Sequence, residues 1–314
     1  AILSSSGPIE LSGTSASSYV YLQNVPTLGF KAGTSVTSST ANILLSFFDA
    51  NWGGSTSPII ATSGSFTFRP SGTSFNRSVY TDWFVLPTTL SALTIGSTTN
   101  TAYVYANTAL TVQGPVTLQG GYVEVSQPIS AAGDILLDGD TGAGLAANVW
   151  GVYSNATVST TAASNGNITL TGRGGNAGSN YGVYLNTSGH ITAGGSGSIS
   201  ITGIGGANAG AYNHGILLYS NLTTTTGALT LNGTGGGTTG SSTNKGIWIS
   251  NSPVLKTTTG TLTLIGTGGF GASSEAIYFN DAGAATLGAV GQSGDIIVRG
   301  NSFLFGGSNL SVLG

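Results

Sequence analysis

The chain has 314 residues and a mass of 31.1 kDa, and only 5% of its residues are charged, with a formal net charge of −3 at pH 7. Ordinary soluble domains carry roughly 25% charged residues, so little charge repulsion opposes the association of one copy with another. The seven Lys and Arg residues are scattered and form no basic stripe, which argues against nucleic acid as a partner. No apolar run reaches the roughly 18 residues that span a bilayer.

Cysteine and methionine are both absent from the sequence. The lack of cysteine is compatible with export without disulfides and also with a reduced compartment. Because the first residue is not methionine, we expect the chain to be a processed product or an excerpt of a longer protein.

The N-terminal part already contains strand motifs, but their spacing is irregular over residues 30–90. A glycine-bounded motif, in which glycine residues flank alternating apolar and polar residues, reads GPIELSG at Gly7, and a second strand, SYVYLQN, follows at Ser18. Further strands read ANILLSFF and GSFTFRP, and the residues between them hold five aromatic side chains, Trp52, Phe75, Tyr80, Trp83 and Phe84. Two interpretations remain: widened coils of the same repeat, or an elaboration that packs against one end of it.

The clearest repeats occupy residues 91–314. The glycine-bounded motif recurs as GDILLDG at Gly133, GNITLTG at Gly166, GSISITG at Gly197, GALTLNG at Gly227, GTLTLIG at Gly260 and GDIIVRG at Gly294. The differences between these residue numbers are 30 to 34, and a motif that returns at about 20–50 residues indicates a solenoid.

One repeat contains three short strands. In the repeat that begins at Gly166, the first strand alternates apolar and polar residues, the second lies around Tyr184, and the third follows at His190. We therefore predict an all-β fold, a right-handed parallel β-helix with three strands per coil and about ten coils, in one elongated solenoid over residues 1–314. The handedness is taken from the general preference of parallel crossovers. We expect the glycines to supply turns with positive φ.

The alternation also predicts which side chains enter the core. The side chains predicted to point inward are Ile168, Leu170, Val183, Leu185 and Ile191. Thr169 and Tyr184 are predicted to point outward. Glycine-rich insertions between the first and second strands are predicted to line one edge of the solenoid, where repeat proteins often bind ligands.

Residues 71–125 carry a resemblance to a known family. The run SGTSF at Ser71, then LSALTIG at Leu90 and NTAYVYANTALTVQGPVTLQGGYVEV to Val125, resembles giant repetitive bacterial surface proteins. These are the filamentous-haemagglutinin-like exoproteins, which are typically exported by two-partner secretion. The resemblance implies an extracellular β-helical stalk used in adhesion or filament building. The family's N-terminal secretion module carries Asn-Pro-rich motifs, and this sequence has no Asn-Pro pair, so the resemblance implies a shaft segment.

The second strand of each coil has one outward position, which is aromatic in most coils. If the coils are aligned, these residues stack into one outward column. Its predicted members are Tyr21 in the first coil, then Tyr105, Glu124, Tyr153, Tyr184, Leu217, Trp248 and Tyr278. One interpretation is a ladder covered by the neighbouring insertions. The other is an exposed stripe that docks another protomer or a glycan.

An asparagine closes the same strand in six coils. These residues are Asn107, Asn155, Asn186, Asn221, Asn251 and Asn280. Stacked side-chain amides form hydrogen bonds along a column, so we predict a structural asparagine ladder.

The sequence offers few groups for catalysis or metal binding. Asp134, Asp138 and Asp140 form the only dense carboxylate cluster, and without calcium-binding nonapeptide repeats they are interpreted as a solvated turn. His190 and His214 lie beside strands of adjacent coils and have no cysteine or second acidic cluster nearby. We predict no cofactor, no metal and no catalytic residue.

Three functions are compatible with these features. The first is a non-enzymatic extracellular structural or adhesive β-helix, a shaft segment or self-assembling subunit of a bacterial surface filament, at the cell surface or secreted. The second is a module that binds a polysaccharide or host ligand. The third is a β-helical polysaccharide lyase or hydrolase, which would need paired carboxylates. We favour the first, with copies of the chain as partners, end to end or side by side, possible glycan or host-surface contacts, and no nucleic acid or membrane span.

Overall fold

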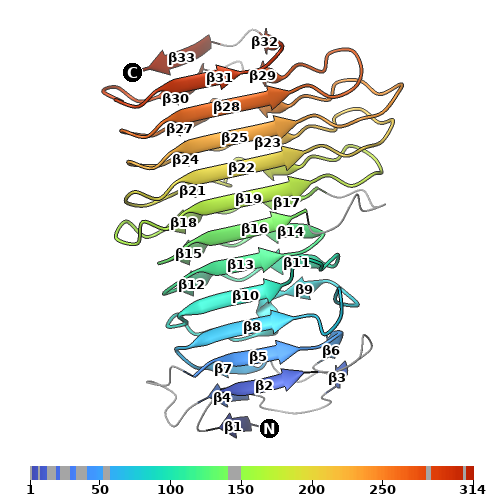
Figure 1. Cartoon of the computed structure of the whole chain (residues 1–314), viewed down its shortest axis with the longest axis vertical. Helices are drawn as coiled ribbons and strands as arrows, with labels where there is room; N and C mark the ends of the chain where they lie inside the picture. The colour runs from blue at the N-terminus through green and yellow to red at the C-terminus, as the bar shows by residue number, and fades with distance from the viewer. Residues whose placement is uncertain are drawn as a thin grey trace.

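The computed structural model describes residues 2–5, 8–12, 19–21, 29–32, 41–51, 57–140, 150–280, 284–306 and 309–314. Its strands stack as successive coils from the N-terminus to the C-terminus (Figure 1). The described part is built from β-strands with one short 3₁₀ turn, η1 (Thr81–Trp83). Trp52 and residues 141–149 of the first long insertion lie outside the described residues.

Three large sheets run along the stack, and every strand pair is parallel. The long sheet has eleven strands: β2 (Ile9–Ser12), β5 (Ile43–Ser46), β8 (Ser65–Arg69), β10 (Ala92–Gly96), β13 (Val116–Gln119), β16 (Ile135–Gly139), β19 (Ile168–Arg173), β22 (Ile199–Ile204), β25 (Leu229–Thr234), β28 (Leu262–Thr267) and β31 (Ile296–Arg299). The second sheet has nine strands: β9 (Val79–Tyr80), β11 (Tyr103–Ala106), β14 (Tyr122–Val125), β17 (Val152–Ser154), β20 (Val183–Leu185), β23 (Ile216–Leu218), β26 (Ile247–Ile249), β29 (Ile277–Phe279) and β32 (Phe303–Phe305). The third sheet has eight strands: β12 (Leu110–Val112), β15 (Ile129–Ala131), β18 (Val158–Thr160), β21 (Ile191–Thr192), β24 (Leu222–Thr223), β27 (Val254–Lys256), β30 (Ala284–Gly288) and β33 (Asn309–Leu313).

Two smaller parallel sheets complete the N-terminal part. One contains β1 (Ile2–Ser5), β4 (Gly29–Ala32) and β7 (Ile59–Ala61), and the other contains β3 (Tyr19–Tyr21) and β6 (Asp49–Asn51). Eight coils, from β10 to β33, each give one strand to all three large sheets. The all-β parallel solenoid with three strands per coil is therefore confirmed, whereas the predicted count of about ten coils is corrected to about eight. The count was too high because the strands before β8 pair partly in these smaller sheets.

Side-chain alternation places one continuous apolar core inside the coils. Along β19, Ile168 and Leu170 are buried while Thr169 between them is half-buried. Ile168 pairs with Ile199 and Leu170 with Ile201 one coil further on. The predicted inward direction of Val183, Leu185 and Ile191 is confirmed as well, since all three are fully buried. Each apolar side chain therefore packs on its counterpart in the next coil.

Two of the aromatic residues predicted from the irregular N-terminal stretch, Phe75 and Phe84, are buried, whereas Tyr80 stacks on Tyr105 outside the core. β8 is hydrogen-bonded between β5 and β10 in the long sheet, and its Phe66 and Phe68 are fully buried. The ring of Phe84 contacts both, with centroid distances of 5.0 Å and 5.2 Å, and Phe75 stacks on Phe68 at 4.8 Å. In this part of the core, packed phenylalanine rings take the place of the aliphatic side chains of later coils.

The glycines of the repeated motif have a steric role that differs from the predicted one. Positive φ values occur at other glycines, such as Gly195 and Gly237, but not at Gly166, Gly197 or Gly203. A Cβ atom on Gly197 would lie 2.1 Å from the carbonyl oxygen of Gly166, and one on Gly203 would lie 2.1 Å from the carbonyl oxygen of Gly215. The motif therefore requires glycine because backbones of adjacent segments approach too closely for any side chain.

Replacing Leu170 by Asp should cost several kcal/mol of unfolding free energy, because it places an unpaired carboxylate in the dry core between two coils. The matched change Thr169→Asp should be mild, since Thr169 faces outward on the same strand. Thermal denaturation and limited proteolysis of both variants measure the difference. Equal tolerance of the two substitutions would contradict the assigned strand direction.

Replacing Gly197 by Ala should lower the unfolding free energy by about 2 kcal/mol or more, because the backbone of the neighbouring coil must shift to admit the methyl group. The exposed neighbour Ser196 supplies the control, and Ser196→Ala should change stability by less than about 0.5 kcal/mol. Denaturant titration of both variants provides the measurement. A Gly197→Ala variant as stable as the parent chain would show that the close approach does not limit this turn.

Candidate functional site

The predicted aromatic stripe lies on the outer face of the second sheet, in one column. Tyr105 pairs with Glu124, Glu124 with Tyr153, and Tyr153 with Tyr184. The strand pairing then continues through Leu217, Trp248 and Tyr278. The column also includes Tyr80 and Leu304, which were not predicted. Tyr21, which was predicted to belong to it, lies on β3 in the separate two-stranded sheet and pairs with Asn51. The structure thus brings the other seven predicted residues together.

The column is largely covered by neighbouring side chains. Leu217 is only 3% exposed, and the aromatic members are half-buried. From Tyr153 to Tyr278, the cover comes from the residues three positions before each column member, where the insertions end: Trp150, Tyr181, His214, Lys245 and Glu275. This second column was not predicted, although an aromatic or polar residue recurs three positions before the outward residue in five consecutive coils, from Trp150 to Glu275.

The rings of the two columns pack mainly on one another. Trp150 lies parallel to Tyr181 with a centroid distance of 6.1 Å, and Tyr181 lies parallel to His214 at 5.3 Å. Trp150 also contacts Tyr153 at 4.8 Å and Tyr184, edge to face, at 5.3 Å. Such pairs contribute about 0.5–1.5 kcal/mol each beyond burial. The observed packing therefore agrees with a covered ladder, and a docking role for the stripe stays a prediction.

Burial in these columns changes the acidity of several tyrosines. Desolvation, with smaller effects of neighbouring ionisable groups, raises the pKa of Tyr105 and of Tyr184 to about 12. Burial also raises the pKa of Tyr122, whose hydroxyl donates a hydrogen bond to Glu124 over 2.8 Å. These phenols stay protonated at neutral pH and act as hydrogen-bond donors.

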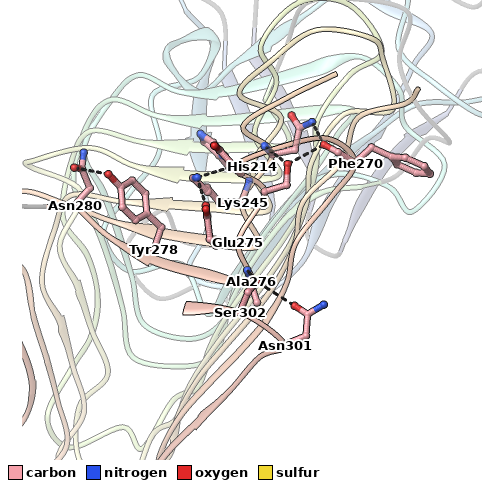
Figure 2. A network of polar contacts seen from close by, with 12 residues as sticks. His214, Lys245, Phe270, Glu275, Ala276, Tyr278, Asn280, Asn301 and Ser302 are labelled. Carbon is pink, nitrogen blue, oxygen red and sulfur yellow. Dashed lines mark hydrogen bonds and ion pairs between the residues drawn. The ribbon is translucent and has the colours of Figure 1, made fainter. Parts of the chain in front are cut away.

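The cover becomes ionic at Lys245 and Glu275 (Figure 2). The ammonium group of Lys245 donates to a carboxylate oxygen of Glu275 and to the carbonyl oxygen of Ser273, and it lies 4.6 Å from the ring centroid of Tyr278. The Lys245 side chain is 3% exposed and that of Glu275 is 19% exposed. Beside the pair, the hydroxyl of Tyr278 donates to Oδ1 of Asn280 over 2.8 Å.

In the second column, His214 lies between the aromatic residue Tyr181 and the charged residue Lys245. Its Nδ1 accepts a hydrogen bond from the backbone N–H of Lys245 over 2.9 Å, which places the proton of the neutral ring on Nε2. Burial, with a smaller contribution from the Lys245 charge, lowers the pKa of His214 from 6.5 to about 3. Nε2 of His214 and Nε1 of the adjacent Trp248 are buried and have no hydrogen-bond partner among the described residues. The imidazole is therefore held neutral in the fold.

The predicted asparagine ladder forms a direct amide contact at one step. Asn186 donates from Nδ2 to Oδ1 of Asn155 over 3.0 Å, and the same nitrogen donates to the hydroxyl of Tyr153. The other four asparagines make further hydrogen bonds: Asn107 Oδ1 accepts from Thr81, Asn221 Oδ1 from the backbone of Val254, Asn280 Oδ1 from Tyr278, and Asn251 Nδ2 donates to the carbonyl of Tyr219. Asn221 and Asn251 come four and three residues after their column members Leu217 and Trp248, whereas Asn155 and Asn186 come two residues after theirs.

A different polar ladder, built on three buried asparagines, was not predicted at the ends of the insertions. The backbone N–H of Asn180 donates to Oδ1 of Asn213 over 3.2 Å, that of Asn213 to Oδ1 of Asn244 over 2.8 Å, and that of Asn244 to the hydroxyl of Ser274 over 3.0 Å. The three asparagines are 0% exposed. Each of their Nδ2 groups ties its own insertion, for example Asn213 to the carbonyl of Gly210 over 2.8 Å. The signal was the sequence Asn-x-Gly before the second strand in three consecutive coils.

The acidic cluster and the two histidines also connect coils. Asp134 Oδ1 accepts from the backbone N–H of Asn167 over 2.7 Å, and Asp140 forms an ion pair of 2.6 Å with Arg173. His190 repeats the role of His214, because its Nδ1 accepts from the backbone N–H of Asn221 over 3.1 Å. Within the described ranges, no group of three or more His, Cys, Asp or Glu side chains is placed to hold a metal ion.

Comparison of the chain with protein-family models, with curated proteins and with solved structures found no match. Of the residues that the structure describes, none belongs to a helix long and apolar enough to cross a membrane.

Acidification should destabilise the fold through His214. Its folded pKa of about 3 lies below the unfolded value of 6.5, so the unfolded chain binds the proton more strongly between these values. The stabilising contribution is therefore present above pH 6.5 and is lost as the pH falls toward 3, by an amount on the order of 4 kcal/mol.

The measurement is Tm between pH 7 and pH 3.5 for the parent chain and for His214→Asn, which keeps an acceptor but cannot gain a proton. The parent should lose clearly more stability than the variant across this interval. Parallel pH profiles would show that protonation of His214 does not contribute.

Proposed function

We propose that the chain is a non-enzymatic structural segment of an extracellular adhesive filament, a β-solenoid shaft. The observation that carries the proposal is the use of its polar side chains. Three carboxylates that could otherwise act as catalytic groups form ion pairs between coils: Asp49 pairs with Arg77, Asp140 with Arg173, and Glu275 with Lys245. In each pair the partners are 28 to 33 residues apart, which is about one coil.

The length and continuity of the stack support the same role. Core residues, glycines and buried amides repeat in register along the axis, so each coil supports its neighbours as in other solenoids. The resemblance of residues 71–125 to filamentous-haemagglutinin-like exoproteins supports a location at the cell surface or in the medium. A right-handed coil, expected from the general crossover preference, is part of the proposal.

Self-association is the partner interaction that we propose. The surface has few charges, since charged residues make up 5% of the chain. Charge is one of the main devices by which natural proteins prevent sheet edges and neutral faces from associating. Copies would therefore join end to end or side by side.

A second candidate function is binding of a glycan or host ligand. It is favoured by a surface cavity at the corner between the long and second sheets, on the side where the insertions lie. A lyase or hydrolase role ranks third, because Asp49, Asp140 and Glu275 are each engaged in an ion pair.

Purified chain at micromolar concentration should sediment as species larger than the 31.1 kDa protomer and appear as rods or bundles in electron micrographs. Added salt should have little effect, because few charges contribute to the contact. A persistent monomer would contradict self-assembly. Release of reducing ends from a panel of polysaccharides would contradict the non-enzymatic role.

A further inference from the structure

An open cavity of about 310 Å³ lies at the corner that precedes β9 and β11. It is lined by residues 74–78, which connect β8 to β9, and by residues 101–103, which connect β10 to β11. Both segments occupy the position of the insertions in later coils. No residue of either aromatic column lines the cavity. The lining residue Tyr103 does contact the ring of Tyr105, which is a column member.

A buried carboxylate organises one wall of the cavity. Oδ2 of Asp49 accepts hydrogen bonds from Nη2 of Arg77 over 2.6 Å and from Nδ2 of Asn76 over 3.1 Å. The Asp49 side chain is 1% exposed, whereas the Arg77 side chain is 50% exposed. The other carboxylate oxygen of Asp49, Oδ1, has no hydrogen-bond partner among the described residues. Asp49 thus holds the side chains of Arg77 and Asn76, two residues that line the cavity, while half of the Arg77 side chain stays exposed.

The other wall is held rigidly between two coils. The hydroxyl oxygen of Ser74 accepts from the backbone N–H groups of Thr101 and Ala102, each over 3.1 Å. The buried Asn100 accepts from the backbone N–H of Phe75 over 3.2 Å. A site on such a fixed frame loses little entropy when a ligand binds.

One aromatic ring completes the lining. Tyr103 contacts Tyr105 and Tyr122 edge to face, with centroid distances of 6.5 Å and 5.6 Å, and these contacts fix the orientation of the ring. Tyr103 is half-buried, so part of its surface remains available. The residues that line the cavity therefore include an aromatic residue, an arginine, an asparagine and a serine: Tyr103, Arg77, Asn76 and Ser78.

We infer that this corner cavity binds a single acidic sugar residue, such as a hexuronate unit of a polysaccharide. Among the described residues Arg77 bonds only to Asp49, and its remaining N–H groups match a carboxylate, because a guanidinium offers a planar fork of donors. Asn76 and Ser78 offer hydrogen bonds to ring hydroxyls. The C–H face of the sugar ring packs on Tyr103, as apolar ligand surface does on aromatic linings. The open side of the cavity leaves room for the rest of the polysaccharide.

This inference rests on the second candidate function, glycan binding, and is independent of the shaft role. The balance of charge favours an acidic over a neutral sugar. The Asp49 carboxylate is buried behind its two donors, so the groups that reach the ligand are neutral or positive. Inorganic anions would satisfy Arg77 but would leave the Tyr103 surface uncovered.

The test is saturation-transfer NMR and calorimetry of the full chain with three probes: sodium D-glucuronate, D-glucose and acetate. We expect glucuronate to bind with a Kd of about 1–10 mM, which is typical of a shallow single-sugar site, and glucose and acetate to bind at least about tenfold more weakly. Arg77→Lys should weaken glucuronate binding about tenfold, because Lys keeps the charge but lacks the fork. Tyr103→Leu, which leaves Asp49 paired, should weaken it by a similar factor.

Arg299→Lys is the matched control, since it makes the same exchange at an exposed arginine on β31 that does not line the cavity, and it should leave binding unchanged. Near-parental Tm values for the variants show that the fold is kept. No saturation transfer to glucuronate at about 20 mM would overturn the inference, as would equal binding of acetate. Glucuronate binding that both Arg77→Lys and Tyr103→Leu leave unchanged would overturn it too. None of these results bears on self-assembly, which the sedimentation experiment tests separately.

Discussion

Parallel, in-register stacking of coils is the constraint on which the rest of the structure depends. The backbone N–H of Ile168 donates to the carbonyl of Ser198 one coil further on, over 2.8 Å, and that of Val183 to Gly215 over 2.9 Å. In the strands of the three large sheets, each residue therefore has as its neighbour the residue at the same position one coil away. Several buried polar groups find a partner along the axis, as the backbone N–H of Asn213 does at Asn244, because the core inside each coil is apolar. Stability therefore depends on columns of equivalent side chains that run along the axis. Residues adjacent in sequence often belong to different columns, as Thr169 and Leu170 do.

Much of the fold could be predicted because the sequence repeats this unit. Alternation within GNITLTG determines that Ile168 and Leu170 face the core, and the recurrence of the motif determines their partners. The reason for its glycines could not be predicted. Sequence indicates that a turn occurs, whereas the clash of a Cβ on Gly197 with the carbonyl of Gly166 depends on the distance between coils. The number of coils was harder to predict where spacing is irregular, since the strands before β8 pair in separate small sheets.

The candidate site could be predicted where residues lie within a strand and less well beyond strand ends. Tyr153 and Tyr184 share one position of their strands, so their pairing follows from register alone. Asparagines after the strand depend on the turn, and Asn251 adopts a positive φ of 69° at such a turn. The buried ladder of Asn180, Asn213 and Asn244 lies at insertion ends whose lengths differ between coils. Each of these asparagines lies three residues before the strand that follows it, and this regular spacing is evident only when residues are counted back from that strand.

Because charged residues are few, each ion pair between coils helps to specify which coil stacks on which. Coils with similar strands could stack in shifted order with little loss of apolar contact, because Ile, Val and Leu replace one another at small cost. Ionic partners are less interchangeable. A shift by one coil would separate Lys245 from Glu275 and Arg77 from Asp49, leaving an almost fully buried charge without its counter-charge. Losing one partner of a buried pair costs about 3–5 kcal/mol. The same few charges that leave the outer surface nearly neutral therefore discriminate the native order of coils from shifted alternatives.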